Sequence, residues 1–486
     1  MKSRKRGISS AILIAILVLA VIAGVAAYLL ITHKPSEEKP SKPEEKPPEE
    51  KPKGVTISVI SRHPTDILVR AREMFLKSDL ARKYNVTDIR TIVIPSGLWE
   101  RYISSGQADV AWGGGPTLFD YLYIEGLLAP FELPEVLDAA SQVPDEIAGM
   151  PMKRVGDDGK IYWVAAAIAS FGFTVNHDRL EDYRLSIPKS WKDLASPEMG
   201  KPLVEFGEAA LGIADPTQST SNTRMYEIIL QRYGWEEGWR VLTLMAANAI
   251  VYSASGDVRD AVIRGDIAVG ITIDFYGYTA MMVNPSCEYV IPLGESIVNG
   301  DPIALVKNSK NPEAAQAFIA WVLTEGQKVW LDPNINRLPA NPRVFETPEG
   351  RERSDLKDAY DRTLETKAMR FNDTLALLYE QVMQWYFRAT LVEVNEYLKD
   401  AWKAVLSKWL AGEISDEEFN KYVSELTAPL KFTDPETGKE VVFTEKYAIG
   451  INDKFISDPA YRDSLISAWK KAAVSKYEKI VHELGG

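Results

Sequence analysis

The chain has 486 residues, of which 46% are hydrophobic and 26% charged. This is the composition of an ordinary globular protein, and it excludes wholesale disorder, a collagen-like helix and a coiled coil. The net charge is −12; because an acidic body repels phosphate backbones and no basic stripe with interleaved aromatic residues is present, nucleic acid is not an expected partner.

The N-terminal segment has the pattern of a membrane anchor. Four basic residues within positions 1–7 precede an uncharged, mostly apolar run over residues 8–32. A helix of that length extends about 37 Å, enough to cross a hydrocarbon layer of about 30 Å. The positive flank predicts a cytoplasmic tail over 1–7, a single-pass anchor, and a body outside the cell or in the periplasm. A cleaved signal peptide is the alternative, because residues 25–27 resemble a small-residue cleavage site.

Residues 33–53 repeat Pro, Glu and Lys without one large apolar side chain. Such a segment buries too little apolar surface to fold, and its prolines favour an extended chain. We therefore expect a disordered stalk of up to about 60 Å between the anchor and the body.

From Gly54 onward, short strand-like runs alternate with helical stretches. The predicted strands cover residues 55–60, 89–94 and 109–112, and the predicted helices cover residues 67–84 and 99–104. Strands separated by helices pair in parallel through right-handed crossovers. The predicted fold class is therefore α/β.

The first candidate ligand residues follow these strands, because open α/β sheets bind ligands beyond the carboxyl ends of their strands. They are His63 and Thr65 after the first strand, and Gly114, Gly115 and Thr117 after the third. Three glycines at 113–115 permit close approach of a ligand, and the helix N-terminus that follows favours an oxyanion. A plain strand-to-helix turn explains the same residues equally well.

A hydroxyl-rich turn over 217–221 precedes a predicted amphipathic helix. Capping that helix needs one hydroxyl, so the four present favour contact with a ligand, including a bound anion. The candidates are Ser219, Thr220 and Ser221, joined by Ser253 and Ser255 at another predicted strand-to-helix turn.

A series of segments then carries a family resemblance. They cover residues 108–113, 171–176, 187–194, 197–201, 215–219, 269–276, 311–318, 325–328 and 338–342. In this order they resemble the extracellular solute-binding proteins of ABC importers, particularly the branch similar to ferric-ion-binding periplasmic proteins. The order is more specific for the fold than for the ligand.

The resemblance implies a type II periplasmic-binding-protein fold, in which two lobes joined by hinge crossovers close over a solute and present it to an ABC transporter permease. Lobe one would comprise residues 54–170 and 276–345, and lobe two residues 171–275. A mainly helical C-terminal extension remains over 346–486. We expect it either to pad the lobe-one side or to dock on the permease.

The resemblance also suggests a ligand. In the ferric-ion-binding branch, an early histidine and two adjacent tyrosines bind iron, which implies a site made of His63, Glu100, Tyr276 and Tyr278. One position of the tyrosine pair is Phe275 in this chain. The alternative is an organic or oxyanionic solute, such as a polyamine, a thiamine-like compound or a phosphonate, with Asp274 facing any cationic group.

We expect neither a cofactor nor an enzyme activity. The sequence has no G-x-S-x-G elbow, Walker-type loop or H-E-x-x-H motif. Scattered carboxylates leave a secreted glycan-active enzyme as a less favoured alternative. The single cysteine, Cys287, cannot form an intrachain disulfide and is expected to be a packing residue.

Overall fold

The computed structural model describes residues 54–485. The predicted tail, anchor and stalk, residues 1–53, lie outside the described residues. Across 54–485, no helix combines the length and the apolar character that crossing a bilayer requires.

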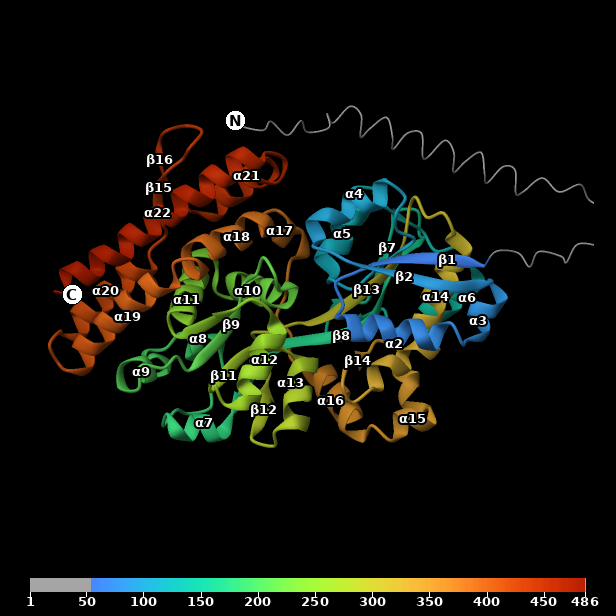
Figure 1. Ribbon diagram of the computed structural model, residues 1–486, viewed down its shortest axis with the longest axis horizontal. Helices are drawn as coiled ribbons and strands as arrows, with labels where there is room; N and C mark the ends of the chain where they lie inside the picture. Colours follow the sequence, from blue (N-terminus) through green and yellow to red (C-terminus); the bar gives the residue numbers. More distant parts are fainter. Residues whose placement is uncertain (1–53, 486) are drawn as a thin grey trace, which may run out of the picture. The chain divides into compact units, whose positions relative to one another are not determined.

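One mixed sheet forms the centre of the described body, with the strand order β10-β9-β11-β8-β13-β3-β1-β2 (Figure 1). These strands are β1 (Val55–Ser61), β2 (Val86–Val93), β3 (Val110–Trp112), β8 (Ile161–Asn176), β9 (Leu211–Ala214), β10 (Ala249–Tyr252), β11 (Val269–Ile273) and β13 (Val298–Val306). β1 pairs in parallel with β2 and β3, and β9 pairs in parallel with β10 and β11. The predicted α/β class is confirmed.

β8 is the strand that joins the two halves of this sheet. Its residues 164–170 pair with β13, and residues 171–175 pair with β11. All residues from 163 to 176 are buried, as expected for a continuous apolar run covered on both faces. We call the side with β1, β3 and β13 the first half and the side with β9, β10 and β11 the second half.

The return to the first half comes later than predicted. After β11 the chain forms α13 (Asp274–Val283) and then β12 (Cys287–Val290), which still pairs with residues 173–176 of β8. Only β13 rejoins the first half, so the crossing lies after residue 290 rather than at the predicted boundary after 275. The segment over 269–276 that carried part of the resemblance is a strand only as far as Ile273, because a helix begins at Asp274.

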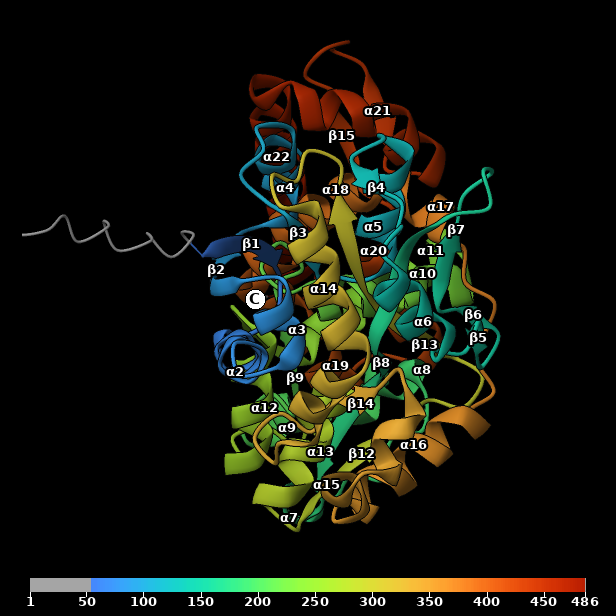
Figure 2. The ribbon, with the colours of Figure 1, turned by 90° about the vertical axis from the view of Figure 1, so that its right-hand side faces the viewer.

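Helices cover both halves. Those of the first half include α2 (Thr65–Phe75), α3 (Asp79–Lys83), α4 (Trp99–Ser104), α5 (Pro116–Ile124), α6 (Pro134–Ser141) and α14 (Pro312–Leu323). Those of the second half include α7 (His177–Asp182), α8 (Trp191–Leu194), α9 (Pro197–Glu205), α10 (Thr220–Tyr233), α11 (Trp235–Ala247) and α12 (Ser255–Arg264). The single helix predicted over 67–84 is interrupted, because the Ser78 hydroxyl accepts from the Ala81 amide and starts α3. α6 and α14 pack together beside the first half (Figure 2).

The C-terminal extension is mainly helical, as predicted. It contains α15 (Pro348–Arg351), α16 (Ser354–Glu365), α17 (Asp373–Leu377), α18 (Glu380–Phe387), α19 (Asn395–Leu410), α20 (Asp416–Thr427), α21 (Glu445–Ser457), α22 (Pro459–Glu483) and a hairpin of β15 (Lys431–Thr433) and β16 (Glu440–Val442). Most of it packs on the second half, which corrects the expectation of padding on lobe one (Figure 1). Phe387 stacks on Tyr226 of α10, with ring centroids 4.3 Å apart.

Trp402 anchors the extension to the second half. Its buried indole N–H donates to the Asn248 side-chain oxygen at 2.7 Å.

We expect Trp402→Ala to lower the free energy of unfolding by about 3–5 kcal/mol because it leaves a cavity. Trp402→Phe should cost about 1–3 kcal/mol, since it mainly leaves Asn248 without its donor. Urea unfolding measures both. Tyr397→Phe, at an exposed position of the same helix, is the control, and an equal effect of all three changes would contradict this role.

Candidate functional site

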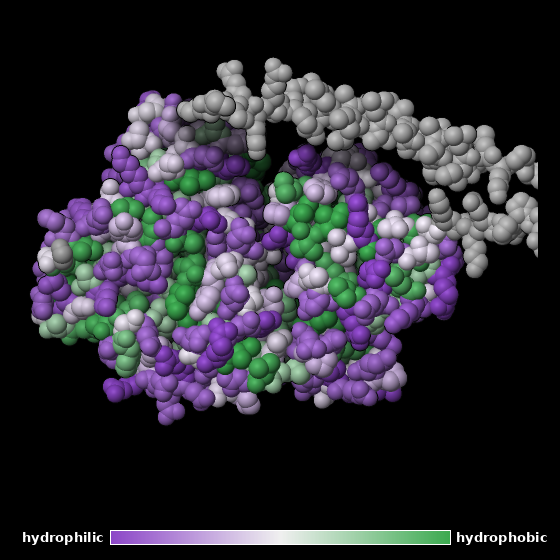
Figure 3. Space-filling view, viewed as in Figure 1, coloured by the Kyte–Doolittle hydropathy of each residue, from purple (hydrophilic) through white to green (hydrophobic). Residues whose placement is uncertain are grey.

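A cavity of about 200 Å³ lies between the two halves, beyond the carboxyl ends of the parallel strands. In the space-filling view, a recess opens near the centre of the face between them (Figure 3). The structure brings these predicted residues to its wall: His63, Gly114, Gly115, Thr117, Ser219, Thr220, Ser221, Ser255 and Tyr276. They come from loops and helix starts that follow β1, β3, β9, β10 and β11.

The glycine loop after β3 has a conformation that other residues rarely adopt. Gly113, Gly114 and Gly115 have φ of 77°, 118° and 86°, and a Cβ on Gly113 would lie 2.6 Å from the His63 ring. The Gly114 N–H donates to Asp301 at 3.1 Å. This loop amide, expected to favour an oxyanion, thus binds a carboxylate of the protein itself.

Asp301 belongs to a buried charge cluster on the cavity wall. Arg337 forms an ion pair with Asp301, and its Nη1 lies 3.0 Å from Nδ1 of His63. Burial, together with the Arg337 charge, lowers the pKa of His63 to about 3, so its ring is neutral near pH 7. Burial acts to raise the pKa of Asp301, but the Arg337 charge outweighs it and the pKa is lowered. The cluster is thus an internally compensated ion pair beside a neutral imidazole.

Three serine hydroxyls meet on the opposite wall. Ser219 caps α10 by accepting from the Asn222 amide at 3.2 Å. The Ser255 hydroxyl, in the first turn of α12, lies within hydrogen-bond distance of both Ser219 and Ser221. These contacts place two helix N-termini and a hydroxyl cluster at one end of the cavity, an arrangement that favours negatively charged groups.

Several predicted residues do not reach the cavity wall. Thr65 is exposed at the start of α2, and the Ser253 hydroxyl donates to Asp257 at 3.0 Å. Asp274 is fully buried and accepts from the Ser170 amide at 2.7 Å. Burial raises the pKa of Asp274 to about 7. None of the three lines the cavity, and the buried Asp274 carboxyl is bound by the protein's own backbone rather than facing a cationic solute group.

The four predicted iron ligands do not converge. Glu100 accepts from the Tyr121 hydroxyl at 2.9 Å outside the cavity wall. Tyr278 packs against Tyr289, with ring centroids 5.5 Å apart. Of the four, only His63 and Tyr276 line the cavity. Across residues 54–485, no group of three or more His, Cys, Asp or Glu side chains could hold a metal ion. The prediction that these four residues together form an iron site is therefore wrong.

Three arginines line the cavity that the sequence did not indicate as site residues: Arg62, Arg224 and Arg337. Arg62 is adjacent to the predicted His63, and Arg224 lies in the first turns of the helix after the hydroxyl-rich turn. Neighbouring predicted site residues could therefore have indicated both arginines. Arg337 had none, because it comes from a loop far along the chain. Its place at the cavity depends on its ion pair with Asp301.

Arg62 differs from the other two arginines in its partners. Arg337 pairs with Asp301 and Arg224 pairs with Asp373, whereas Arg62 forms no ion pair with any residue of the described range. Its Nη1 donates to the Ile94 carbonyl at 3.3 Å. Its buried Nε has no partner among the described residues, which is also true of Arg224 and Arg337. Burial lowers the pKa of Arg62, which reflects the cost of removing this cation from water.

Comparison with known proteins agrees with this arrangement. The family model described as "Bacterial extracellular solute-binding protein" matches residues 83–357, more than half of the chain. The chain belongs to this family. It is a solute-binding protein of the ABC-importer type, and the family and its structural neighbours are binding proteins rather than enzymes.

Individual relatives are more distant. The phosphoglycerate transport regulatory protein PgtC of Salmonella typhimurium is 26% identical over 324 residues, 66% of this chain and 74% of that protein. The periplasmic binding protein P5PA has a TM-score of 0.52 at 18% identity, over 74% of this chain and 99% of that one. AfuA of Actinobacillus pleuropneumoniae, with fructose-6-phosphate bound, has a TM-score of 0.50 at 20% identity, over 64% and 99%. The two structures support the predicted periplasmic-binding-protein fold.

The buried His63 should leave a signature in the pH dependence of stability. The folded protein binds its proton only near pH 3, whereas the unfolded chain binds it near pH 6.5. As pH falls from 6.5 to 3, the unfolded state gains a proton that the folded state lacks, so the wild type loses stability relative to His63→Gln. The difference in the free energy of unfolding between the wild type and His63→Gln should change by at most about 1.4 kcal/mol per pH unit.

Chemical denaturation at several pH values measures this difference. Comparison with the variant is needed because Asp274, whose pKa is raised to about 7, contributes the opposite slope between pH 3.8 and 7. Equal slopes for the wild type and His63→Gln would contradict a neutral, buried His63.

Proposed function

We propose that this protein captures a small organic anion, of the phosphate-ester class, in the cavity between its halves and delivers it to an ABC transporter permease. The observation that carries the proposal is Arg62, a cavity-lining guanidinium with no carboxylate partner among the described residues. Arg62 is half-buried, and removing a cation even partly from water without a counterion is costly. An anionic solute provides that counterion.

The opposite wall supports the same solute class. Ser219, Ser221 and Ser255 are hydroxyl donors at the starts of α10 and α12, where main-chain amides carry partial positive charge. Phosphate oxygens accept from hydroxyls, amides and guanidinium groups alike. The cavity of about 200 Å³ suits a solute of a few carbon atoms with one such group.

The names of two relatives point to phosphorylated compounds. PgtC is named for phosphoglycerate transport, and the AfuA structure contains fructose-6-phosphate. The Arg62 observation is independent of both names. Ferric iron is the weaker candidate, because Glu100 and Tyr278 lie off the cavity wall and Arg337 occupies Nδ1 of His63.

We also propose that residues 8–32 anchor the chain and that the body faces the cell exterior or the periplasm. The support is the apolar run with its basic flank in the sequence. A tethered receptor remains at high effective concentration near its permease.

Arg62→Gln should weaken binding of 3-phosphoglycerate about 10- to 100-fold, because a charge-assisted contact to phosphate is lost. Titration calorimetry, together with the ligand-dependent rise in melting temperature, measures the effect. Arg101→Gln changes an exposed arginine of α4 and should bind like the wild type. Fructose 6-phosphate and ferric citrate are the comparison ligands. Stabilisation by ferric citrate alone would reject the proposal.

Deletion of residues 1–32 should release the protein from membranes. The full chain should stay in the pellet after alkaline carbonate washing, because that treatment removes peripheral proteins and leaves spanning helices in place. A full chain that is recovered in the soluble fraction with its N-terminus cleaved would show that the segment is a signal peptide.

A further inference from the structure

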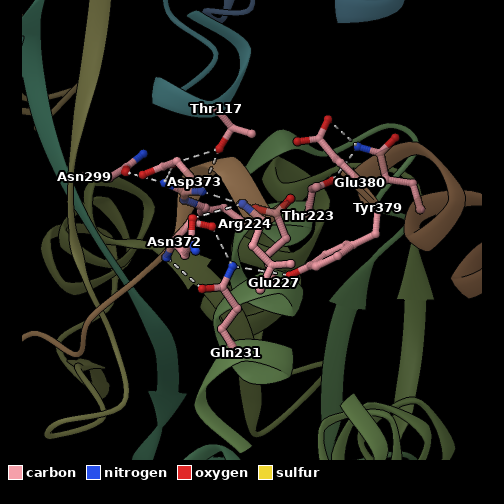
Figure 4. Close-up of polar contacts among 12 residues, drawn as sticks. Thr117, Thr223, Arg224, Glu227, Gln231, Asn299, Asn372, Asp373, Tyr379 and Glu380 are labelled. Carbon is pink, nitrogen blue, oxygen red and sulfur yellow. Dashed lines mark hydrogen bonds and ion pairs between the residues drawn. The ribbon is translucent and has the colours of Figure 1, made fainter. Parts of the chain in front are cut away.

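The C-terminal extension forms part of the cavity. Residues 371–384 cross between α5 of the first half and α10 of the second, and Glu380 and Gln384 of α18 line the cavity wall. Figure 4 shows Glu380 and Asp373 of this stretch near Arg224 and Glu227 of α10. Both positions lie beyond residue 357, where the match to the family ends. This chain therefore builds one wall of its binding site from residues outside the family's shared region.

Both terminal nitrogens of Arg224 have partners around this wall, while its buried Nε has none among residues 54–485. Its guanidinium donates to Asp373 at 2.6 Å, Thr117 at 2.7 Å and Asn299 at 3.0 Å (Figure 4). Its Cζ lies 3.9 Å from the centre of the Phe371 ring. The carboxylate of Asp373 neutralises Arg224 without lining the cavity. The extension thus leaves Arg62 as the cation available to a solute anion.

Next to Arg224, two carboxyl groups line the cavity. Glu227 of α10 is 1% exposed, and its Oε2 lies 3.3 Å from Nη1 of Arg224. Its Oε1 is buried and has no hydrogen-bond partner among residues 54–485, and Glu380 lines the same cavity. We call Glu227 and Glu380 the acidic pair.

The charges around the acidic pair set its protonation. Arg224 is already neutralised by Asp373, so the pair cannot rely on it as a full counterion. Burial, and for Glu227 also the nearby Glu380 charge, raises the pKa of both carboxyls. The charged and titratable neighbours are Arg224, Asp373 and Tyr379. Glu227 Oε1 therefore remains a buried hydrogen-bond acceptor without a donor from the described residues, at the wall of the cavity.

We propose that the acidic pair binds a hydrogen-bond donor of the solute, a hydroxyl or an ammonium group, while Arg62 binds its anionic group. This rests on the proposed function and deepens it: the solute is a phosphate ester with a donor group close to the phosphate. Glu380 of the C-terminal extension is then a specificity-determining residue. A solute lacking the donor leaves the buried acceptor Glu227 unsatisfied and is discriminated against.

Three matched esters test this: ethyl phosphate, 2-hydroxyethyl phosphate and 2-aminoethyl phosphate. Titration calorimetry on the full chain gives the ratio of each donor ester's affinity to that of ethyl phosphate. We expect a ratio of about 10 or more for at least one donor ester. In Glu380→Met, which keeps the chain length and helix propensity, the ratio should fall to about 1. Glu417→Met, at an exposed position of α20, should keep the wild-type ratio.

Glu380→Gln identifies the donor. An amide oxygen still accepts from a hydroxyl but does not balance an ammonium charge, so this variant should keep a preference for the hydroxyethyl ester and lose one for the aminoethyl ester. Glu380→Ala replaces Glu380→Met if the latter does not fold. Equal affinity of the wild type for all three esters, or an unchanged ratio in Glu380→Met, overturns this inference alone. No binding of any phosphate ester overturns the proposed function and this inference with it.

Discussion

The structure depends on the hydrogen bonding of one buried strand. β8 pairs with β13 through residues 164–170 and with β11 through residues 171–175, and its residues 163–176 are buried together with their backbone groups. Each of those groups must find a partner in one half or the other. Because β8 pairs with a strand of each half, this requirement joins the two halves into a single sheet. It also brings the carboxyl ends of the parallel strands on either side to a common cavity.

The cavity wall is polar, and most of its buried charges are compensated within the protein. Asp301 is paired with Arg337 and receives the Gly114 amide, while Arg224 is paired with Asp373. Such compensation is what makes buried charge tolerable in a folded protein. Against this background Arg62 is the exception among the arginines of the wall. An uncompensated group in an otherwise balanced site therefore points to ligand chemistry more strongly than the number of polar residues does.

The sequence allowed the strands and the loops after them to be predicted, because strand periodicity and glycine-rich turns are local signals. Asp274 could not be placed, since its burial depends on the Ser170 amide, 104 residues away in the sequence. The pair of Arg224 and Asp373 joins positions 149 residues apart. The resemblance to ferric-ion-binding proteins indicated the fold correctly but suggested ligands that do not converge, because the fold alone does not determine which side chains reach the cavity.

The contribution of the C-terminal extension follows from where Arg224 finds its partners. Thr117 belongs to the first half, Arg224 to the second half and Asp373 to the extension, and all three meet in one hydrogen-bonded cluster. Contacts of the protein itself therefore span the cavity and fix the side chains around it. Binding a solute to side chains that are already ordered costs less conformational entropy. The extension, anchored to the second half by Trp402 and Phe387, thus couples the packing of the C-terminal helices to the geometry of the solute site.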